Sequence, residues 1–257
     1  MDLAKLYTLA GKTALVTGAS SGLGDYFARV MAQAGAEVIV AARRVQKLET
    51  LVAEIRDTGG TAHAVALDVS DRDSVRAAFS RIDRFVGKLD IVVNNAGIAN
   101  SPKKFVDLPE AEWEQLLETN LNGAWRVAHE AARRMRDAGH GCIVNTSSIY
   151  SLATGLYKTD YNVSKAALAQ LRKNMALELA RHGVRVNTLC PGYFSSAINA
   201  REFNTERGRE YIKRLVPQRL GALPELAGPL LLLVSDAGSF INGITLPVDG
   251  GALLAPV

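Results

Sequence analysis

Short apolar runs alternate along this chain with longer segments in which apolar residues recur every three or four positions. Several of the runs are apolar throughout, as is typical of strands that are buried on both faces of a sheet. The runs predict strands over residues 12–16, 37–41, 61–67, 89–93, 141–146, 184–189 and 244–248. The segments between them predict amphipathic helices over residues 24–34, 45–58, 71–85, 110–137, 160–181 and 224–234.

This alternation of strand and helix predicts the fold class. It gives a parallel sheet with helices on both faces, and right-handed crossovers make that sheet a doubly wound, Rossmann-type α/β fold. Because the chain has 257 residues and no repeat, linker or low-complexity tract, we expect one domain over residues 1–257. Residues 195–218 interrupt the alternation with a polar segment rich in Arg and Glu, which we interpret as a substrate lid.

Composition and charge exclude several classes of function. Hydrophobic residues make up 48% of the chain and charged residues 22%, which is ordinary for a soluble globular protein. The net charge of +4 comes without a nucleic-acid-binding motif, so we expect no nucleic-acid partner. The chain has neither an apolar run of membrane-spanning length nor the layout of a signal peptide at its N-terminus, which favours a cytoplasmic enzyme. Cys142 and Cys190 lie in apolar strands without metal-ligand spacing, so we predict buried structural thiols and no metal site.

A glycine-rich turn, residues 17–24, joins the first predicted strand to the first predicted helix. Its glycines allow tight turns and a close approach of the backbone to a pyrophosphate. The N-terminus of the following helix favours the same anion. The position of the turn between strand and helix therefore predicts a dinucleotide site, with contacts from Gly18, Ser20, Ser21, Gly22, Leu23 and Gly24.

The end of the second strand indicates which dinucleotide is bound. NAD-binding sheets usually carry an Asp or Glu there, which binds the ribose 2′-hydroxyl. This chain has Ala42 at that position, followed by Arg43 and Arg44. With no carboxylate to repel a 2′-phosphate, Arg43 is placed to pair with it. We therefore expect NADP(H) as the favoured cofactor, with NAD(H) as the alternative.

The next two strands also end in polar or small residues. Asp68, followed by Val69, is either an acceptor for the adenine amino group or a cap for the next helix. After the fourth strand, the small residues of the turn formed by Asn95, Ala96 and Gly97 allow it to pass beneath the cofactor ribose and also to brace the central sheet.

The residues that indicate catalysis are Tyr161 and Lys165, which stand four residues apart in a predicted helix and so share one face of it. An ammonium beside a phenol favours the phenolate, which predicts a lowered pKa for Tyr161. Such a phenol can exchange a proton with a substrate near neutral pH. Combined with a dinucleotide site, it predicts hydride transfer coupled to proton transfer on a carbonyl or an alcohol.

These motifs, taken in order, resemble the short-chain dehydrogenase/reductase superfamily of the single-domain type. The resemblance covers nearly the whole chain, from about Gly11 to Gly251, and its motifs are the glycine turn, Asp68, the turn at 94–97, Asn120, Ser148, Tyr161 with Lys165, and Pro191 with Gly192. It implies an NADP(H)-preferring enzyme that acts on CH–OH and C=O groups, similar to 3-oxoacyl reductases and to sugar-acid or polyol dehydrogenases.

The resemblance also implies a role for each matching residue. Tyr161 is the expected general acid or base, and Lys165 is expected to tune it and to hold the nicotinamide ribose. Ser148 is expected to bind the substrate oxygen; it is preferred to Ser147 because it stands thirteen residues before Tyr161. Asn120 is expected to kink its helix and hold a water in a proton relay, or else to satisfy buried backbone groups. Further cofactor contacts are implied for Pro191, Gly192, Phe194 and Ser196.

The substrate is a small-molecule carbonyl or alcohol whose identity stays open. Aromatic pocket walls are expected from Tyr150, Tyr157, Tyr193 and Phe194. The basic residues of the lid indicate either an ordinary helix with paired charges or an anionic substrate, such as an acyl thioester or a sugar acid.

Two other classes of protein share these features in part. One is a catalytically silent regulator that senses a dinucleotide, although such a protein should lack the Tyr or the Lys. The other is an epimerase or dehydratase, which usually carries an added C-terminal portion for a nucleotide sugar.

The resemblance further implies a homotetramer, or a homodimer, in which the helices at 110–137 and 160–181 pair with those of a second copy.

Overall fold

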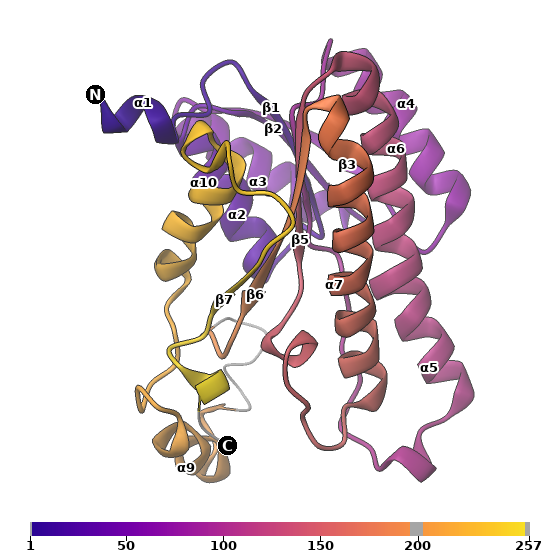
Figure 1. The fold of residues 1–257 in the computed structure, drawn as a ribbon, viewed down its shortest axis with the longest axis vertical. Helices are drawn as coiled ribbons and strands as arrows, with labels where there is room; N and C mark the ends of the chain where they lie inside the picture. Colours follow the sequence, from indigo (N-terminus) through magenta and orange to yellow (C-terminus); the bar gives the residue numbers. More distant parts are fainter. Residues whose placement is uncertain (1, 196–202, 255–257) are drawn as a thin grey trace.

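The seven predicted strands form one parallel sheet in a computed structural model that describes residues 2–195 and 203–254 (Figure 1). Their order across the sheet is β3-β2-β1-β4-β5-β6-β7. The strands are β1 (Thr13–Thr17), β2 (Glu37–Ala42), β3 (Thr61–Ala66), β4 (Ile91–Asn94), β5 (Gly141–Thr146), β6 (Val184–Pro191) and β7 (Thr245–Val248). The predicted doubly wound α/β fold is confirmed.

The order in which successive strands are added to the sheet reverses at β1. Leu15 of β1 pairs with Ile39 of β2 on one side and with Val92 of β4 on the other. The chain thus moves outward from β1 to β3 and then returns to begin the second half at β4. A crevice forms outside the carboxyl ends of the strands at such a switch point, and it is the place where ligands bind in open α/β sheets.

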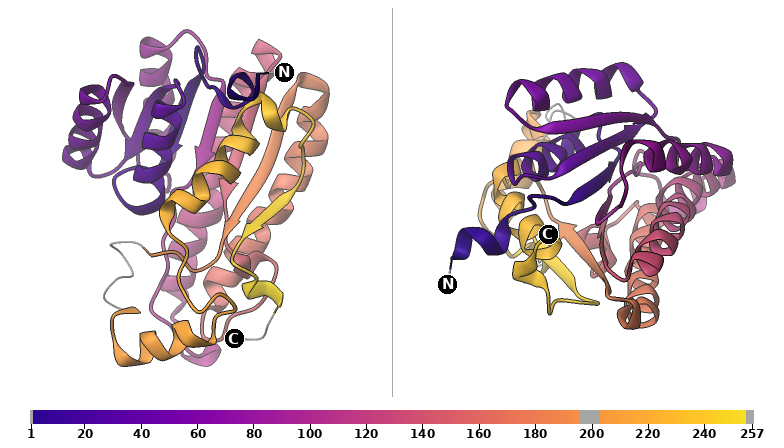
Figure 2. Two further views of the ribbon diagram at one scale, coloured as in Figure 1. Left: turned by 90° about the vertical axis from the view of Figure 1, so that its left-hand side faces the viewer. Right: turned by 90° about the horizontal axis from the view of Figure 1, so that it is seen from above.

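Helices cover both faces of the sheet (Figure 2). The cluster on one face includes residues of α2, α3 and α10, and that on the other includes residues of α4, α6 and α7. The α-helices are α1 (Leu3–Tyr7), α2 (Gly22–Gln33), α3 (Val45–Asp57), α4 (Arg72–Phe85), α5 (Glu110–Leu117), α6 (Ala124–Ala138), α7 (Thr159–Leu179), α9 (Glu206–Arg214) and α10 (Ala227–Val234). Short 3₁₀ turns span Phe105–Asp107, Ile149–Ser151, Ala180–His182, Leu223–Leu226, Asp236–Gly238 and Ala252–Leu254.

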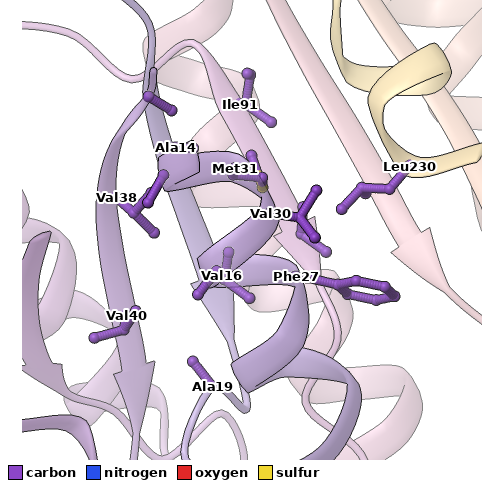
Figure 3. Close-up of a cluster of buried hydrophobic side chains, with 14 of the residues drawn as sticks. Ala14, Val16, Ala19, Phe27, Val30, Met31, Val38, Val40, Ile91 and Leu230 are labelled. Atoms are coloured by element: carbon purple, nitrogen blue, oxygen red, sulfur yellow. The ribbon is translucent and has the colours of Figure 1, made fainter. Parts of the chain in front are cut away.

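The core on the α2 face shows why these segments pack as they do. Phe27 and Met31, one helical turn apart, are fully buried against Val16 of β1 and Val38 of β2, with Leu230 of α10 beside them (Figure 3). The strands are apolar throughout because both of their faces are covered. This packing holds the N-terminus of α2 at the carboxyl end of β1.

Two elements differ from the ranges predicted by periodicity, and a third agrees with one of the two alternatives left open for the lid. The expected helix at 110–137 is interrupted by a π-helix over Glu118–Gly123, which separates α5 from α6. The segment expected to be a lid contains α9, in which Lys213 pairs with Glu210 at 2.6 Å. The short helix α1 was not predicted, because its five residues are too few for periodicity to reveal.

In the described part of the chain, no helix combines the length and the apolar character needed to cross a membrane. Within the same ranges, no three His, Cys, Asp or Glu side chains come together as a metal-binding group. Cys142 and Cys190 are both buried free thiols, as predicted.

Candidate active site

The glycine turn forms a close-packed cradle between β1 and α2. Gly18 has a φ of +67°, and a Cβ there would lie 2.9 Å from the Cα of Ala96. A Cβ on Gly24 would lie 2.5 Å from the carbonyl oxygen of Gly18. Ser21, the N-cap of α2, makes no side-chain capping hydrogen bond. The first N–H groups of α2 therefore lack a side-chain cap, as expected where a helix N-terminus receives a phosphate.

A cavity of about 530 Å³ runs from this turn to the predicted catalytic pair. It brings together residues from the ends of β1 to β5 and from α7, as the switch point requires. The predicted residues that line it are Gly18, Ser20, Ser21, Gly22, Leu23, Arg43, Asp68, Val69, Asn95, Ala96, Gly97, Tyr161 and Lys165. Its size is suited to a dinucleotide or a similarly large ligand.

Both arginines after β2 line this cavity, but their contacts differ. The side chain of Arg43 is 69% exposed and stands 3.9 Å from the Asp68 carboxylate. The guanidinium of Arg44 reaches back to the glycine turn and donates to Ser20 Oγ at 2.8 Å and to Ser21 Oγ at 2.7 Å. The contact of Arg43 with a 2′-phosphate stays a prediction, and the structure places the guanidinium of Arg44 against the glycine turn as well. Sequence spacing does not reveal which of two adjacent arginines folds back.

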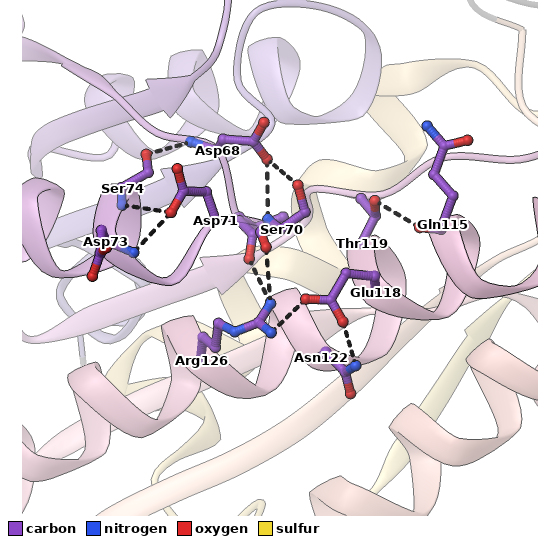
Figure 4. A network of polar contacts seen from close by, with 11 residues as sticks. Asp68, Ser70, Asp71, Asp73, Ser74, Gln115, Glu118, Thr119, Asn122 and Arg126 are labelled. Carbon is purple, nitrogen blue, oxygen red and sulfur yellow. Dashed lines mark hydrogen bonds and ion pairs between the residues drawn. The ribbon is translucent and has the colours of Figure 1, made fainter. Parts of the chain in front are cut away.

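Asp68, which lines the cavity, belongs to a polar network with Ser70 and its neighbours (Figure 4). The Asp68 carboxylate accepts hydrogen bonds from the backbone N–H of Ser70 at 3.0 Å and from its hydroxyl at 2.6 Å. The N-cap of α4 is Asp71, which accepts from two backbone N–H groups of the first turn. Of the two roles weighed for Asp68, capping of that helix is thus the wrong one. The adenine contact stays a prediction, supported by the place of Asp68 in the cavity wall.

The turn after β4 does brace the sheet. The hydroxyl of Thr17 accepts hydrogen bonds from the N–H groups of Asn95 and Ala96, each at 3.0 Å. The side-chain amide of Asn95 donates in turn to the carbonyl oxygen of Thr17 at 3.0 Å. These bonds fasten the carboxyl ends of β1 and β4 together, and they leave Ala96 and Gly97 in the cavity wall. Thr17, which the sequence prediction included in the glycine turn without a role of its own, is thus a supporting residue.

Tyr161 and Lys165 lie together on α7, with the Lys165 Nζ 5.5 Å from the centre of the Tyr161 ring. The ammonium donates to the carbonyl oxygen of Thr146 at 3.1 Å. Burial lowers the pKa of Lys165 to about 8. Burial also raises the pKa of Tyr161, and a hydrogen bond with Ser148 offsets this only in part.

The predicted lowering of the Tyr161 pKa is therefore wrong for this arrangement. The Lys165 ammonium lies 5.5 Å from the centre of the phenol ring, and burial of the Tyr161 hydroxyl outweighs the influences that lower its pKa. What the sequence predicted correctly is the shared helix face of the two side chains.

The two serines after β5 have different partners. Ser147 donates through its hydroxyl to the carbonyl oxygen of Lys165 at 3.2 Å and so ties β5 to α7. The hydroxyl of Ser148 accepts from the backbone N–H of Tyr150 at 3.2 Å and hydrogen-bonds Tyr161. Ser148 is thus the serine that contacts the candidate acid, in agreement with the choice made from spacing.

Asn120 lies in the π-helix, where the predicted helix distortion occurs. Its side-chain oxygen accepts from the N–H of Ile98 at 2.7 Å, and its amide donates to the Ile98 carbonyl at 2.8 Å. Arg126 binds Glu118 at the start of the π-helix and also donates to the carbonyls of Val69 and Ser70 (Figure 4). Asn120 therefore satisfies buried backbone groups beside the cavity, and the proton-relay role stays a prediction.

Four predicted cofactor residues do not line the cavity. Gly24 lies beneath the turn, and Gly192 follows β6, where its N–H donates to the carbonyl of Val248 at 2.9 Å. Pro191 is the last residue of β6. The side chain of Phe194 is buried in the core on the α2 face, against Gly221; the expected cofactor contact through the backbone after Gly192 stays a prediction. Ser196 lies outside the described residues.

A family model described as short chain dehydrogenase matches residues 12–207. The chain is 36% identical to gluconate 5-dehydrogenase of Gluconobacter oxydans, with 96% of each chain covered. It is 39% identical to an L-rhamnose 1-dehydrogenase (NAD(P)(+)) of Sphingomonas, with 95% and 96% covered. A gluconate 5-dehydrogenase of Burkholderia cenocepacia, solved in complex with NADP and tartrate, superposes with a TM-score of 0.94 at 36% identity, covering 99% of this chain and all of the other.

Proposed function

This chain belongs to the short-chain dehydrogenase family, and we propose that it prefers NADP(H) and acts on a sugar acid or a related polyhydroxylated molecule. Its reaction class follows from the family: it is an NAD(P)-dependent oxidoreductase that transfers a hydride to or from a carbonyl or secondary alcohol. The alternative of a catalytically silent regulator is not favoured, because the relatives are dehydrogenases and Ser148, Tyr161 and Lys165 are all present.

One observation carries the proposal: the glycine cradle and the Tyr161–Lys165 pair lie on the walls of one cavity. The fit of the residues to a dinucleotide rests on the tight glycine contacts and on the N-terminus of α2, which has no side-chain cap. The ends of β3 and β4 supply the rest of the wall. The bound nicotinamide cofactor supplies the hydride acceptor or donor.

The protein's own residues handle the proton. During reduction, the Tyr161 hydroxyl, which burial keeps protonated, gives its proton to the substrate oxygen as the carbon of that carbonyl receives the hydride. Oxidation is the reverse and starts from the Tyr161 phenolate, which takes the hydroxyl proton of the substrate. Ser148 donates a hydrogen bond to the substrate oxygen, on which negative charge develops. Lys165 holds a positive charge near Tyr161 at pH values below its pKa of about 8.

The preference for NADP(H) is supported by two guanidinium groups and by the lack of a carboxylate at the end of β2. Arg43 and Arg44 both line the cavity there, and Ala42 occupies the last position of the strand. A 2′-phosphate accepts charge-assisted hydrogen bonds from guanidinium groups.

A homotetramer or homodimer is part of the proposal. Apolar side chains are exposed on the outer helices, with Leu177 of α7 82% exposed and Trp125 of α6 49% exposed. Light scattering of the purified protein measures the mass directly; a monomer at micromolar concentration contradicts this part of the proposal.

The function is tested by a substrate screen that follows NADPH absorbance. Gluconate, rhamnose, simple ketones and 3-oxoacyl thioesters, or their oxidised or reduced counterparts, are offered with NADP(H) and with NAD(H). The expected result is the highest kcat/KM with a sugar acid and NADP(H). Preferential turnover of a 3-oxoacyl thioester or of an apolar ketone contradicts the proposed substrate class. A preference for NAD(H) contradicts the proposed cofactor.

A further inference from the structure

Three tyrosine hydroxyls from separate segments meet beside the candidate catalytic residues. Tyr150 belongs to the 3₁₀ turn Ile149–Ser151, Tyr193 follows β6, and Tyr211 lies on α9. The hydroxyls of Tyr150 and Tyr193 are 2.8 Å apart, and the hydroxyl of Tyr211 donates to that of Tyr193. The rings of Tyr193 and Tyr211 meet edge to face, with their centres 5.3 Å apart. We call these three residues the tyrosine cluster.

Tyr150 links the cluster to the catalytic centre. Its ring stands edge to face with that of Tyr161, at 6.3 Å between centres and an angle of 87°. Its backbone N–H donates to the hydroxyl of Ser148 at 3.2 Å. A Cβ at Gly155 would come within 2.4 Å of the Tyr150 ring, so the ring is held in a slot that only a glycine leaves open. Tyr150 is therefore fixed against both residues that handle the reacting oxygen.

Tyr211 links the same cluster to the predicted lid. Helix α9 begins at Glu206, with Thr205 as its cap, and its charged side chains pair locally, as Lys213 does with Glu210. Tyr211 instead points its hydroxyl inward to Tyr193. The cluster thus extends from the ring of Tyr161, through Tyr150 and Tyr193, to α9.

The chemistry of the cluster favours a substrate with several hydroxyl groups. A phenol both donates and accepts hydrogen bonds, and two phenols at hydrogen-bonding distance match a pair of neighbouring alcohols, which donate and accept in the same way. Burial raises the pKa of Tyr193, so this phenol stays protonated through the neutral range. An anionic group is less well matched, because the cluster itself has no cation.

We propose that the hydroxyls of Tyr150 and Tyr193 form a subsite for the hydroxyl group next to the reacting carbon of the substrate, and that Tyr211 couples this contact to α9. The proposal rests on the proposed function, since it identifies the feature of a polyhydroxylated substrate that the site recognises. It makes Tyr150 and Tyr193 specificity-determining residues for the family's reaction.

The size of the effect follows from the contacts within the cluster. The hydroxyls of the cluster bind one another, so a substrate without the neighbouring hydroxyl does not leave them wholly unpaired. The enzyme should therefore discriminate less between hydroxylated and unhydroxylated substrates than a site with an isolated buried donor would. We expect a preference of about tenfold in kcat/KM for a ketone with a neighbouring hydroxyl over the same ketone without it.

The test compares 2-hydroxycyclohexanone with cyclohexanone, which differ in that one hydroxyl, in the NADPH-dependent reduction by the full-length enzyme. The wild type is expected to favour the hydroxyketone about tenfold. Tyr150→Phe and Tyr193→Phe are each expected to reduce this preference to about twofold or less, by lowering kcat/KM for the hydroxyketone alone. Tyr211→Phe is expected to raise KM for the hydroxyketone. Tyr7→Phe, at an exposed position on α1, is the matched control, and thermal melting establishes that each variant is folded.

Three results would overturn the proposal: a wild type without the preference or without activity on the hydroxyketone, phenylalanine variants that keep the preference, or an equal fall for both ketones. The last result would mean that the tyrosines only support Tyr161 and Ser148. A preference for the hydroxyketone in an enzyme inactive on sugar acids would refute the proposed substrate class and leave the subsite standing. If the phenylalanine variants turn over sugar acids and keep the wild-type preference for the hydroxyketone, the subsite is refuted and the proposed substrate class stands.

Discussion

The two arginines after β2 allow the cofactor proposal to be tested quantitatively. The perturbation is Arg44→Ala, compared with Arg43→Ala and with the double variant. Arg44 binds the hydroxyls of Ser20 and Ser21 at 2.7–2.8 Å and so holds its charge over the glycine turn. Arg43 is 69% exposed and stands 3.9 Å from the Asp68 carboxylate. The structure therefore predicts that Arg44 contributes more than Arg43 to binding of NADPH.

The magnitudes follow from the exposure of each side chain. A hydrogen bond to a charged group contributes about 1.5–3 kcal/mol, and because Arg44 stands at the open rim of the cavity we expect about 1–2 kcal/mol. This corresponds to NADPH binding that is weaker by about 5- to 30-fold in Arg44→Ala. An exposed ion pair contributes up to about 1 kcal/mol, so Arg43→Ala should weaken NADPH binding by about fivefold or less.

Titration of cofactor fluorescence measures both dissociation constants at fixed salt. Binding of NADH, which lacks the 2′-phosphate, should change by about twofold or less in Arg43→Ala, and slightly more in Arg44→Ala because Ser20 and Ser21 lose a partner. The NADPH affinity lost in Arg44→Ala should also shrink as salt is raised. Equal weakening of NADPH and NADH in both variants would refute the phosphate role. It would leave the arginines as supports of the turn.

Three further predictions concern the catalytic pair and the turn. Tyr161→Phe should lower kcat by about 10²- to 10⁴-fold with NADPH affinity kept; turnover near the wild-type level would reject its role in proton transfer. Lys165 has a folded-state pKa of about 8, below its ordinary value of 10.5, so the unfolded state binds more protons between these pH values and stability should rise as pH rises through this window. In cofactor-free protein, Lys165→Met should abolish that rise and stabilise the fold at pH 7 by up to about 3 kcal/mol. Urea unfolding at pH 7 and 9.5 measures both effects. A pH dependence of stability unchanged from the wild type would show that the ammonium is not held in a desolvated site. Gly24→Ala should reduce stability by about 1–3 kcal/mol and weaken cofactor binding, because its Cβ would lie 2.5 Å from a carbonyl oxygen; the matched helix variant Gly228→Ala, with no atom within 4 Å of the added Cβ, should be neutral or stabilising.

Local patterns in the sequence determined the order of the elements and much of the cavity wall. Strands buried on both faces must be apolar throughout, and a helix must present an apolar stripe to the sheet, so the alternation alone specified a doubly wound fold. Gly18 and the other glycines of the turn allow backbone conformations that other residues rarely adopt, so the residue types alone predicted the turn. Tyr161 and Lys165 share a helix face because of helix geometry alone.

The tertiary structure decided those properties that depend on segments far apart in the chain. Periodicity does not distinguish an α-helix from one interrupted by a π-helix, and the interruption follows the bonds between Asn120 and Ile98. Which arginine folds back over the turn depends on Ser20 and Ser21, more than twenty residues earlier. The pKa of Tyr161 depends on how deeply the packed fold buries its hydroxyl and on the hydrogen bond with Ser148. The meeting of Tyr150, Tyr193 and Tyr211 joins three distant segments, and no spacing in the sequence encodes it, because only the packed sheet brings their hydroxyls together.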